Sequence, residues 1–263
     1  MADDYTTIRC AAPRPGVVEL RLARPEKRNA MDADMIRELH TAFLSLGADP
    51  DVRVIVMAAE GDVFCAGGDL EWMRTQSARS RAGRIEGASE LAHMLGAIDT
   101  CPNLVIARVQ GRAFGGGLGL LCVSDVVIST NLAEFSLTET RLGLIPATIG
   151  PFVIRRMGAG MARQIFYSGA VFGTEFGLRS GLITEAVLPN ELDECAARQI
   201  EAALNTAPGA SVAAKALWRD LAGHISPEVV ERSIEALAER WETGEAAAGI
   251  DAFLSRRPMP WAP

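Results

Sequence analysis

The sequence predicts an α/β core in which strands and helices alternate, followed by a helical C-terminal third. Short apolar runs separated by loops recur in the first half of the chain, whereas after about residue 148 helical patterns replace them. The chain has 263 residues, of which 49% are hydrophobic, enough to bury a sizeable core. No linker or low-complexity segment divides it. We therefore expect a core over residues 1–200 and a helical C-terminal region over residues 201–263.

The first half contains the expected strands and two long helices. Residues 17–22 alternate like a half-buried strand, and a loop then leads to a helix from about Asp32, whose apolar residues fall on one face. Residues 83–99 show a second helical stripe. Further apolar runs are typical of buried strands and cover residues 52–57, 104–110 and 125–129.

Helical patterns follow one another in the second half, several of them opened by Thr, Asn or Ser-Pro start signals. The expected helices lie near residues 150–157, 160–168, 174–180, 190–206, 209–222, 227–242 and 245–254.

Composition and charge exclude several classes of function. A net charge of −7 argues against a nucleic-acid-binding surface, so the cluster Arg79, Arg81 and Arg84 is read as a solvated helix face or as local anion contacts. The N-terminus lacks the pattern of a signal peptide, and no apolar run is long enough to cross a membrane. Five scattered cysteines are typical of reduced thiols, so we expect a cytoplasmic protein without membrane contact.

Two glycine-rich loops each follow an expected strand. Residues 111–121 carry five of the 25 glycines, and residues 64–69 form a second loop of similar character. The spacing of the first loop does not match a dinucleotide-binding or P-loop pattern. Tight packing of a helix on the sheet is one explanation of such glycines. The other is that the two loops direct two backbone N–H groups at one point, which would form an oxyanion hole.

Four stretches of the sequence resemble a known family when they are taken together, in this order and at this spacing. They cover residues 24–31, 64–70, 111–121 and 135–146. On these stretches the chain resembles the crotonase (enoyl-CoA hydratase/isomerase) superfamily over residues 15–260. The resemblance implies a spiral of ββα units with a helical C-terminal region that builds homotrimers, often paired as hexamers. It also implies an acyl-CoA substrate and no cofactor besides the coenzyme A of that substrate.

The resemblance also assigns the site residues. It implies that the N–H groups of Ala66 and Gly116 bind the thioester oxygen, where charge develops when an enolate forms, and that Glu139 is the catalytic acid/base. Family hydratases commonly carry a second glutamate, at the position that is Gly119 here. The expected substrate- and coenzyme A-binding positions are Lys27, Ala66, Gly67, Gly68, Asp69, Leu70 and Gly116.

No metal site is expected, because the three histidines lack the spacing of metal ligands. Trp72 is a candidate wall of the acyl pocket or an ordinary core residue.

Three functions are considered at this point, and decarboxylation and thioester hydrolysis, which the resemblance also allows, stay open beside them. The first is hydration of a 2-enoyl-CoA by a single glutamate. Residues 69–73, 114–121 and 143–151 resemble bacterial methylglutaconyl-CoA and isohexenylglutaconyl-CoA hydratases. That finer resemblance suggests the hypothesis that a substrate carboxylate compensates for the missing acid at Gly119. The second is a Δ3,Δ2-enoyl-CoA isomerase, for which one base suffices, and the third is a non-catalytic acyl-CoA-binding oligomer.

Overall fold

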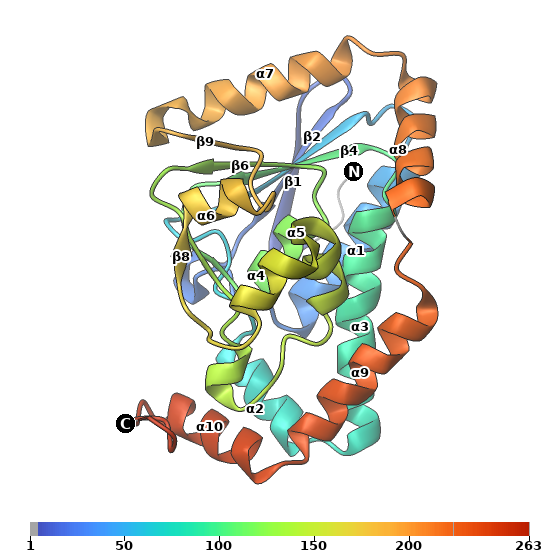
Figure 1. The fold of residues 1–263 in the computed structure, drawn as a ribbon. Coiled ribbons are helices and arrows are strands. Elements are labelled where there is room, and N and C mark those ends of the chain that lie inside the picture. Colours follow the sequence, from blue (N-terminus) through green and yellow to red (C-terminus); the bar gives the residue numbers. More distant parts are fainter. Residues whose placement is uncertain (1–4, 223, 263) are drawn as a thin grey trace.

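The computed structural model describes residues 5–222 and 224–262 and contains a six-stranded sheet (Figure 1). Its order is β1-β2-β3-β4-β6-β9, in which β1 and β2 are antiparallel and all other neighbours are parallel. The bounds are β1 Ile8–Arg14, β2 Val17–Leu22, β3 Val54–Ala59, β4 Leu104–Val109, β6 Val126–Thr130 and β9 Glu185–Val187. The strands expected from apolar runs are confirmed, with β3 beginning two residues later than expected.

Helices cover both faces of this sheet. Alternate side chains of a strand point to opposite faces, and Ile55 and Met57 of β3 pack in the core cluster that includes α1 (Ala33–Ala48) and α3 (Arg81–Thr100). Val54 and Val56 of the same strand pack against α7 (Leu192–Leu204) on the other face. Figure 1 shows α7 crossing one side of the sheet while α1 and α3 run together along the other. Burial on both faces explains why these strands are continuous apolar runs.

A smaller sheet positions the glycine-rich loops. It contains β5 (Ala113–Phe114), β7 (Glu134–Ser136) and β8 (Phe172–Gly173) in that order. The helix α4 (Gly116–Cys122) begins directly after β5, and Cys65 forms a parallel bridge with Ala113. The two glycine-rich loops therefore lie side by side, as the oxyanion-hole interpretation requires.

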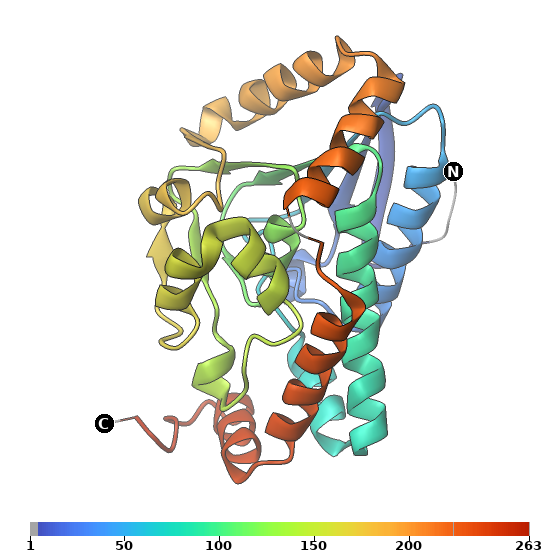
Figure 2. The same cartoon turned by 45° about the vertical axis from the view of Figure 1, so that its right-hand side comes forward.

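The C-terminal helices pack on the core of their own chain, as Figure 2 shows for α9. The core clusters join α9 (Pro227–Trp241) to α3, and α10 (Gly244–Leu254) to α2 (Leu70–Ala78) and the 3-10 helix η2 (Glu139–Leu142). In α8 (Pro208–Ala222), by contrast, no residue is buried. The remaining elements are α5 (Gly150–Ile165), α6 (Thr174–Arg179) and the 3-10 helices η1 (Pro25–Lys27) and η3 (Pro189–Glu191).

The expected pair of helices near 150–157 and 160–168 corresponds to α5, which has a non-helical residue, Gly158, with φ 72° and ψ 152° at the break. Within the described ranges, no helix is both long and apolar enough to span a membrane.

Candidate active site

The loop between β2 and α1 is fixed by a buried asparagine. Asn29 has a left-handed φ of 52°, a conformation that asparagine tolerates better than most residues. Its side-chain amide donates to the carbonyl oxygens of Glu60 and Val63, each at 2.8 Å, and its Oδ1 accepts the N–H of Arg24 at 2.9 Å. Asn29 thus ties this loop to the end of β3, where the loop that contains Ala66 begins.

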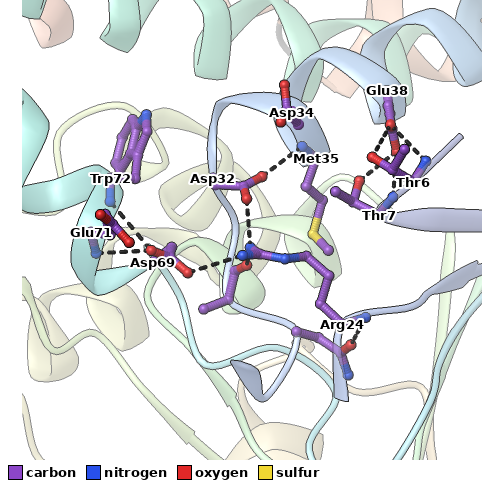
Figure 3. A network of polar contacts seen from close by, with 12 residues as sticks. Thr6, Thr7, Arg24, Asp32, Asp34, Met35, Glu38, Asp69, Glu71 and Trp72 are labelled. Atoms are coloured by element: carbon purple, nitrogen blue, oxygen red, sulfur yellow. Dashed lines mark hydrogen bonds and ion pairs between the residues drawn. The ribbon is translucent and has the colours of Figure 1, made fainter. Parts of the chain in front are cut away.

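Arg24 connects the starts of two helices (Figure 3). Its guanidinium pairs with Asp32 at 2.9 Å and with Asp69 at 3.2 Å. Asp32 caps α1, and Asp69 caps α2 by accepting the N–H groups of Glu71 and Trp72. Asp69, one of the expected coenzyme A-binding residues, is only 4% exposed, so its carboxylate acts within the protein as a helix cap and ion-pair partner.

Gly116 is the first residue of α4, where backbone N–H groups lack intrahelical acceptors. No other described residue accepts its N–H either. A Cβ at this position would overlap Cε of Met31, so only glycine fits without moving that side chain. The helix N-terminus adds a partial positive charge at the same point. The structure therefore leaves one preorganised donor open beside Met31.

The N–H of Ala66, the second expected donor, already has an acceptor. It donates to the carbonyl oxygen of Arg28 at 3.1 Å. The following residue, Gly67, has a φ of 96°, and a Cβ there would lie 3.1 Å from the carbonyl oxygen of Phe114. A ligand oxygen at this point would share the Ala66 N–H with Arg28 in a three-centre hydrogen bond.

Glu139 begins η2 and packs against the glycine-rich loop. A Cβ on Gly115 would lie 3.2 Å from Oε1 of Glu139. The residue retains some exposed surface, but its Oε2 is sealed from water and has no hydrogen-bond partner in the described part of the chain. Desolvation by burial raises the pKa of Glu139 to about 7. A carboxyl group with this pKa can both accept and donate a proton near neutral pH.

The position of the missing second acid is filled by a neighbouring side chain. A Cβ on Gly119 would lie 2.6 Å from Cγ2 of Ile149 and 3.7 Å from Cδ2 of Leu95. Ile149 itself is buried and lines the same cavity as Glu139. A longer side chain at Gly119 therefore has no room, which gives a packing reason for this glycine.

A cavity of about 150 Å³ brings most of the expected site residues together. Trp72 also lines this cavity, in keeping with a wall of the acyl pocket. Lys27 and Leu70 do not line it and are exposed, and Asp69 lies behind it as the cap of α2. The expected residues that line the cavity are Ala66, Gly67, Gly68, Gly116 and Glu139.

Sequence reasoning missed the far end of this cavity. Gln76 and Arg84 contribute from α2 and α3, and Trp241 and Phe253 from α9 and α10. The sequence offered one hint of this end of the cavity: Arg84 stands in the arginine cluster that was interpreted either as a solvated helix face or as local anion contacts. The aromatic residues lie more than 100 positions after Glu139, and no spacing in the sequence connects them with it.

A larger cleft of about 950 Å³ lies between α8 and the main sheet and contains none of the expected site residues. Two ion pairs line it, Lys215 with Asp125 at 2.6 Å and Arg155 with Asp99, and its other guanidinium groups donate to backbone carbonyl oxygens. Within the described ranges, no group of three or more His, Cys, Asp or Glu residues could hold a metal ion. The chemistry therefore centres on the smaller cavity.

Known proteins are similar to this chain in both sequence and fold. The sequence profile of the enoyl-CoA hydratase/isomerase family matches residues 13–263. An enoyl-CoA hydratase from Alternaria alternata is 33% identical over 205 residues, which are 78% of this chain and 67% of that protein. A crystal structure of an enoyl-CoA hydratase from Shewanella pealeana is 33% identical with a TM-score of 0.80, covering 98% of this chain and 96% of that one.

A crystal structure of an enoyl-CoA hydratase from Mycobacterium avium is 29% identical with a TM-score of 0.86, covering 97% and 99% of the two chains. The α/β fold with mixed sheets and C-terminal helices is thus that of its relatives. The chain belongs to the enoyl-CoA hydratase/isomerase family, the crotonase superfamily.

Proposed function

We propose that this protein is an enoyl-CoA hydratase, a hydro-lyase that adds water across the double bond of a 2-enoyl-CoA. The observation that carries the proposal is the Glu139 carboxyl group, whose pKa burial raises to about 7, in the same cavity as the N-terminus of α4. The named relatives from three organisms are hydratases, which favours this reaction within the family.

In the proposed reaction the carboxylate of Glu139 accepts a proton from water while the hydroxyl oxygen adds to C3 of the substrate. The electrons of the double bond move onto the thioester oxygen, and the N–H groups of Gly116 and Ala66 stabilise the resulting enolate. Glu139 then returns its proton to C2, so that one water has been added in total. Each donor of such a hole is typically worth about 3–4 kcal/mol, and a positioned acid/base about 10²–10⁴-fold in rate.

We propose further that the substrate is a branched glutaconyl-type thioester, such as 3-methylglutaconyl-CoA or isohexenylglutaconyl-CoA. The supporting features are the finer sequence resemblance and Gly119, which leaves Glu139 as the only acid lining the cavity among the described residues. If plain crotonyl-CoA is hydrated as fast as 3-methylglutaconyl-CoA, this substrate class is wrong.

The presence of a single acid, Glu139, among the described residues that line the cavity also favours a second candidate, a Δ3,Δ2-enoyl-CoA isomerase. That reaction moves one proton between C2 and C4, so a single base such as Glu139 satisfies it. The two reactions differ in mass, because hydration adds one water and isomerisation adds nothing.

The test is a set of 2-enoyl- and 3-enoyl-CoA thioesters followed by mass spectrometry with wild type, Glu139→Gln and a matched control, Glu134→Gln. Glu134 lies five residues earlier, pairs with Arg112 at 2.6 Å and does not line the cavity. We expect a mass gain of one water with wild type and the control, and a loss of at least about 100-fold with Glu139→Gln. Full turnover by Glu139→Gln would remove Glu139 from the mechanism. If wild type turns over none of the thioesters, the third function, a non-catalytic acyl-CoA-binding oligomer, is favoured instead.

We also propose that the chain forms a homotrimer or homohexamer through α8. Leu217, Trp218 and Leu221 of this helix are 57%, 50% and 78% exposed, and large apolar side chains that lie together on a surface mark interaction sites. A cytoplasmic location fits the buried cysteines at positions 65, 101, 122 and 195, none of which forms a disulfide.

A further inference from the structure

We propose that Arg84 and Gln76 form a binding site for a carboxylate at the distal end of the acyl chain. The inference rests on the proposed function, because it treats the cavity as an acyl pocket. It goes further in assigning two side chains to recognition of the substrate's far end. Both residues line the cavity, and neither was expected there from the sequence.

Arg84 differs from the other arginines of its cluster. Arg79 pairs with Glu86 at 2.7 Å, and Arg81 pairs with Glu235 at 2.6 Å, both on the surface. Arg84 is half-buried, lines the cavity and forms no ion pair with any described carboxylate. A guanidinium that lacks an acidic partner at the wall of a cavity is a ready partner for an anionic ligand.

The Arg84 guanidinium is also held in one orientation. Its Nε donates to the carbonyl oxygen of Gln76 at 3.2 Å, and its Nη2 donates to that of Ser77 at 2.8 Å. The guanidinium carbon lies 6.0 Å from the ring centre of Trp241, which also lines the cavity. Nη1 makes no hydrogen bond to a described residue, so one edge of the fork remains available while the other is anchored on α2.

Gln76 supplies a second polar group beside it. The residue is 5% exposed, yet its side-chain amide makes no hydrogen bond to any described residue. The amide rests against Gly87 of α3, where a Cβ would lie 2.8 Å from Oε1 and 3.0 Å from Nε2. The amide atoms of Gln76 are not among the side-chain polar atoms sealed without a partner, so they keep access to the cavity, and Nε2 can donate to a carboxylate there.

The surroundings favour a carboxylate at the far end of the chain. Among the described residues that line the cavity, only Glu139 and Arg84 are ionisable. On α3, Arg84 lies eleven residues before Leu95, which approaches Gly119, and eleven residues span about 16 Å of helix. Arg84 is thus well removed from the level of α4. A carboxylate paired with it would serve binding, and it would not replace the acid that is missing at Gly119.

The experiment measures binding of saturated probes, which cannot react, by isothermal titration calorimetry. Adipyl-CoA and hexanoyl-CoA have the same chain length and differ in a terminal carboxylate or methyl group. Dodecanedioyl-CoA and dodecanoyl-CoA form a longer pair, which is needed because Arg84 lies about 16 Å along α3 from the level of Leu95. The variants are Arg84→Met, Arg84→Lys and Gln76→Leu. Arg74→Met is the matched control, because Arg74 is an exposed arginine on α2 that does not line the cavity.

We expect wild type to prefer the carboxylate member of at least one pair. Arg84→Met should lower that preference about ten- to a hundredfold, the range for hydrogen bonds to charged groups, with Arg84→Lys in between. Gln76→Leu should lower it several-fold, and the control should keep it. If Arg84 only supports the end of α2, both probes of a pair will weaken equally, and the proposal is overturned.

Two further results separate this site from the proposed reaction. If Arg84→Met does not fold, Gln76→Glu replaces it as the decisive variant. A carboxylate at position 76 should repel the carboxylate member of each probe pair and leave binding of the methyl member unchanged. If Gln76→Glu keeps the wild-type preference for the carboxylate member, the site is refuted. Hydration of enoyl-CoA without any preference for the carboxylate probes would overturn the site and leave the hydratase intact. A carboxylate preference that Arg84→Met abolishes, without hydration of any thioester, supports the site and refutes the reaction.

Discussion

Replacing Glu139 by glutamine should make the protein inactive and, above neutral pH, more stable. Burial raises the pKa of Glu139 from 4.5 to about 7, so the folded chain holds a proton that the unfolded chain releases between these values. The unfolded state therefore binds fewer protons than the folded state in this window, and stability must fall as the pH rises from about 4.5 to 7. Glutamine removes this dependence because it does not ionise.

The size of the effect follows from the same pKa. Each pKa unit corresponds to about 1.4 kcal/mol, so the shift amounts to about 3 kcal/mol at most, of which about 2–3 kcal/mol develops between pH 5 and pH 8. Urea titrations at pH 5 and pH 8 give the free energy of unfolding at each pH. Between these two values it should fall by about 2–3 kcal/mol more in wild type than in Glu139→Gln. The control Glu134→Gln should behave like wild type.

The activity of wild type should show the same ionisation. As the proposed base, Glu139 must be a carboxylate in the free enzyme, so kcat/KM should rise as the pH increases through about 7. If Glu139→Gln retains the wild-type decrease in stability between pH 5 and pH 8, the burial argument is wrong. A variant that gains stability while it loses activity would mark Glu139 as a residue kept for function.

Three further variants test the packing around the site and the proposed assembly. Gly119→Glu should cost about 1–3 kcal/mol of unfolding free energy by crowding Ile149, and adding Ile149→Ala should relieve part of that cost. If the double variant instead costs the sum of the two single variants, the contact between the two positions is contradicted. Asn29→Ala should cost about 2–4 kcal/mol in urea denaturation, because it removes three buried hydrogen bonds, and a cost below about 1 kcal/mol would speak against that role. The double variant Leu217→Glu/Leu221→Glu should convert a trimer or hexamer into monomers in light scattering, and unchanged assembly would exclude this face of α8.

The fold could be predicted wherever an element buries a regular set of apolar side chains. The strands β3 and β4 lie between two helical layers, so their apolar runs are continuous, and α1 shows its buried face at helical spacing. Two of the elements that escaped prediction bury little, whereas α4 escaped because it is only seven residues long, although six of them are buried. In β1, at the edge of the sheet, only Ile8 is buried, and in α2 only Met73 and Gln76 are buried. The division at residue 200 stays a prediction.

The candidate site was predictable only where neighbouring residues in the sequence are also neighbours in space. Gly116 and Glu139 stand in short stretches that identify the family, and both line the cavity. The contact of Ile149 with Gly119 joins positions thirty apart, and Arg84 meets Trp241 from the other end of the chain. Such contacts depend on the packing of α9 and α5 on the core, which no local pattern encodes.

The cavity holds its two ionisable residues, Glu139 and Arg84, in separate roles of proton transfer and ligand recognition, and a last prediction follows from this. Burial is the largest cause of the raised pKa of Glu139, a backbone hydrogen bond within the residue opposes it, and no charged neighbour contributes. A second carboxylate at Gly119 would raise this pKa further by repulsion, whereas Ile149 in that space keeps it near neutrality. Arg84 can therefore recognise an anionic group without tuning the acid. The pH midpoint of kcat/KM in Arg84→Met should consequently stay within about one unit of that in wild type, since the Arg84 charge is not among the causes of the raised pKa of Glu139. A larger downward or upward displacement would show that the two groups are coupled, and it would turn Arg84 from a recognition residue into a part of the acid/base machinery.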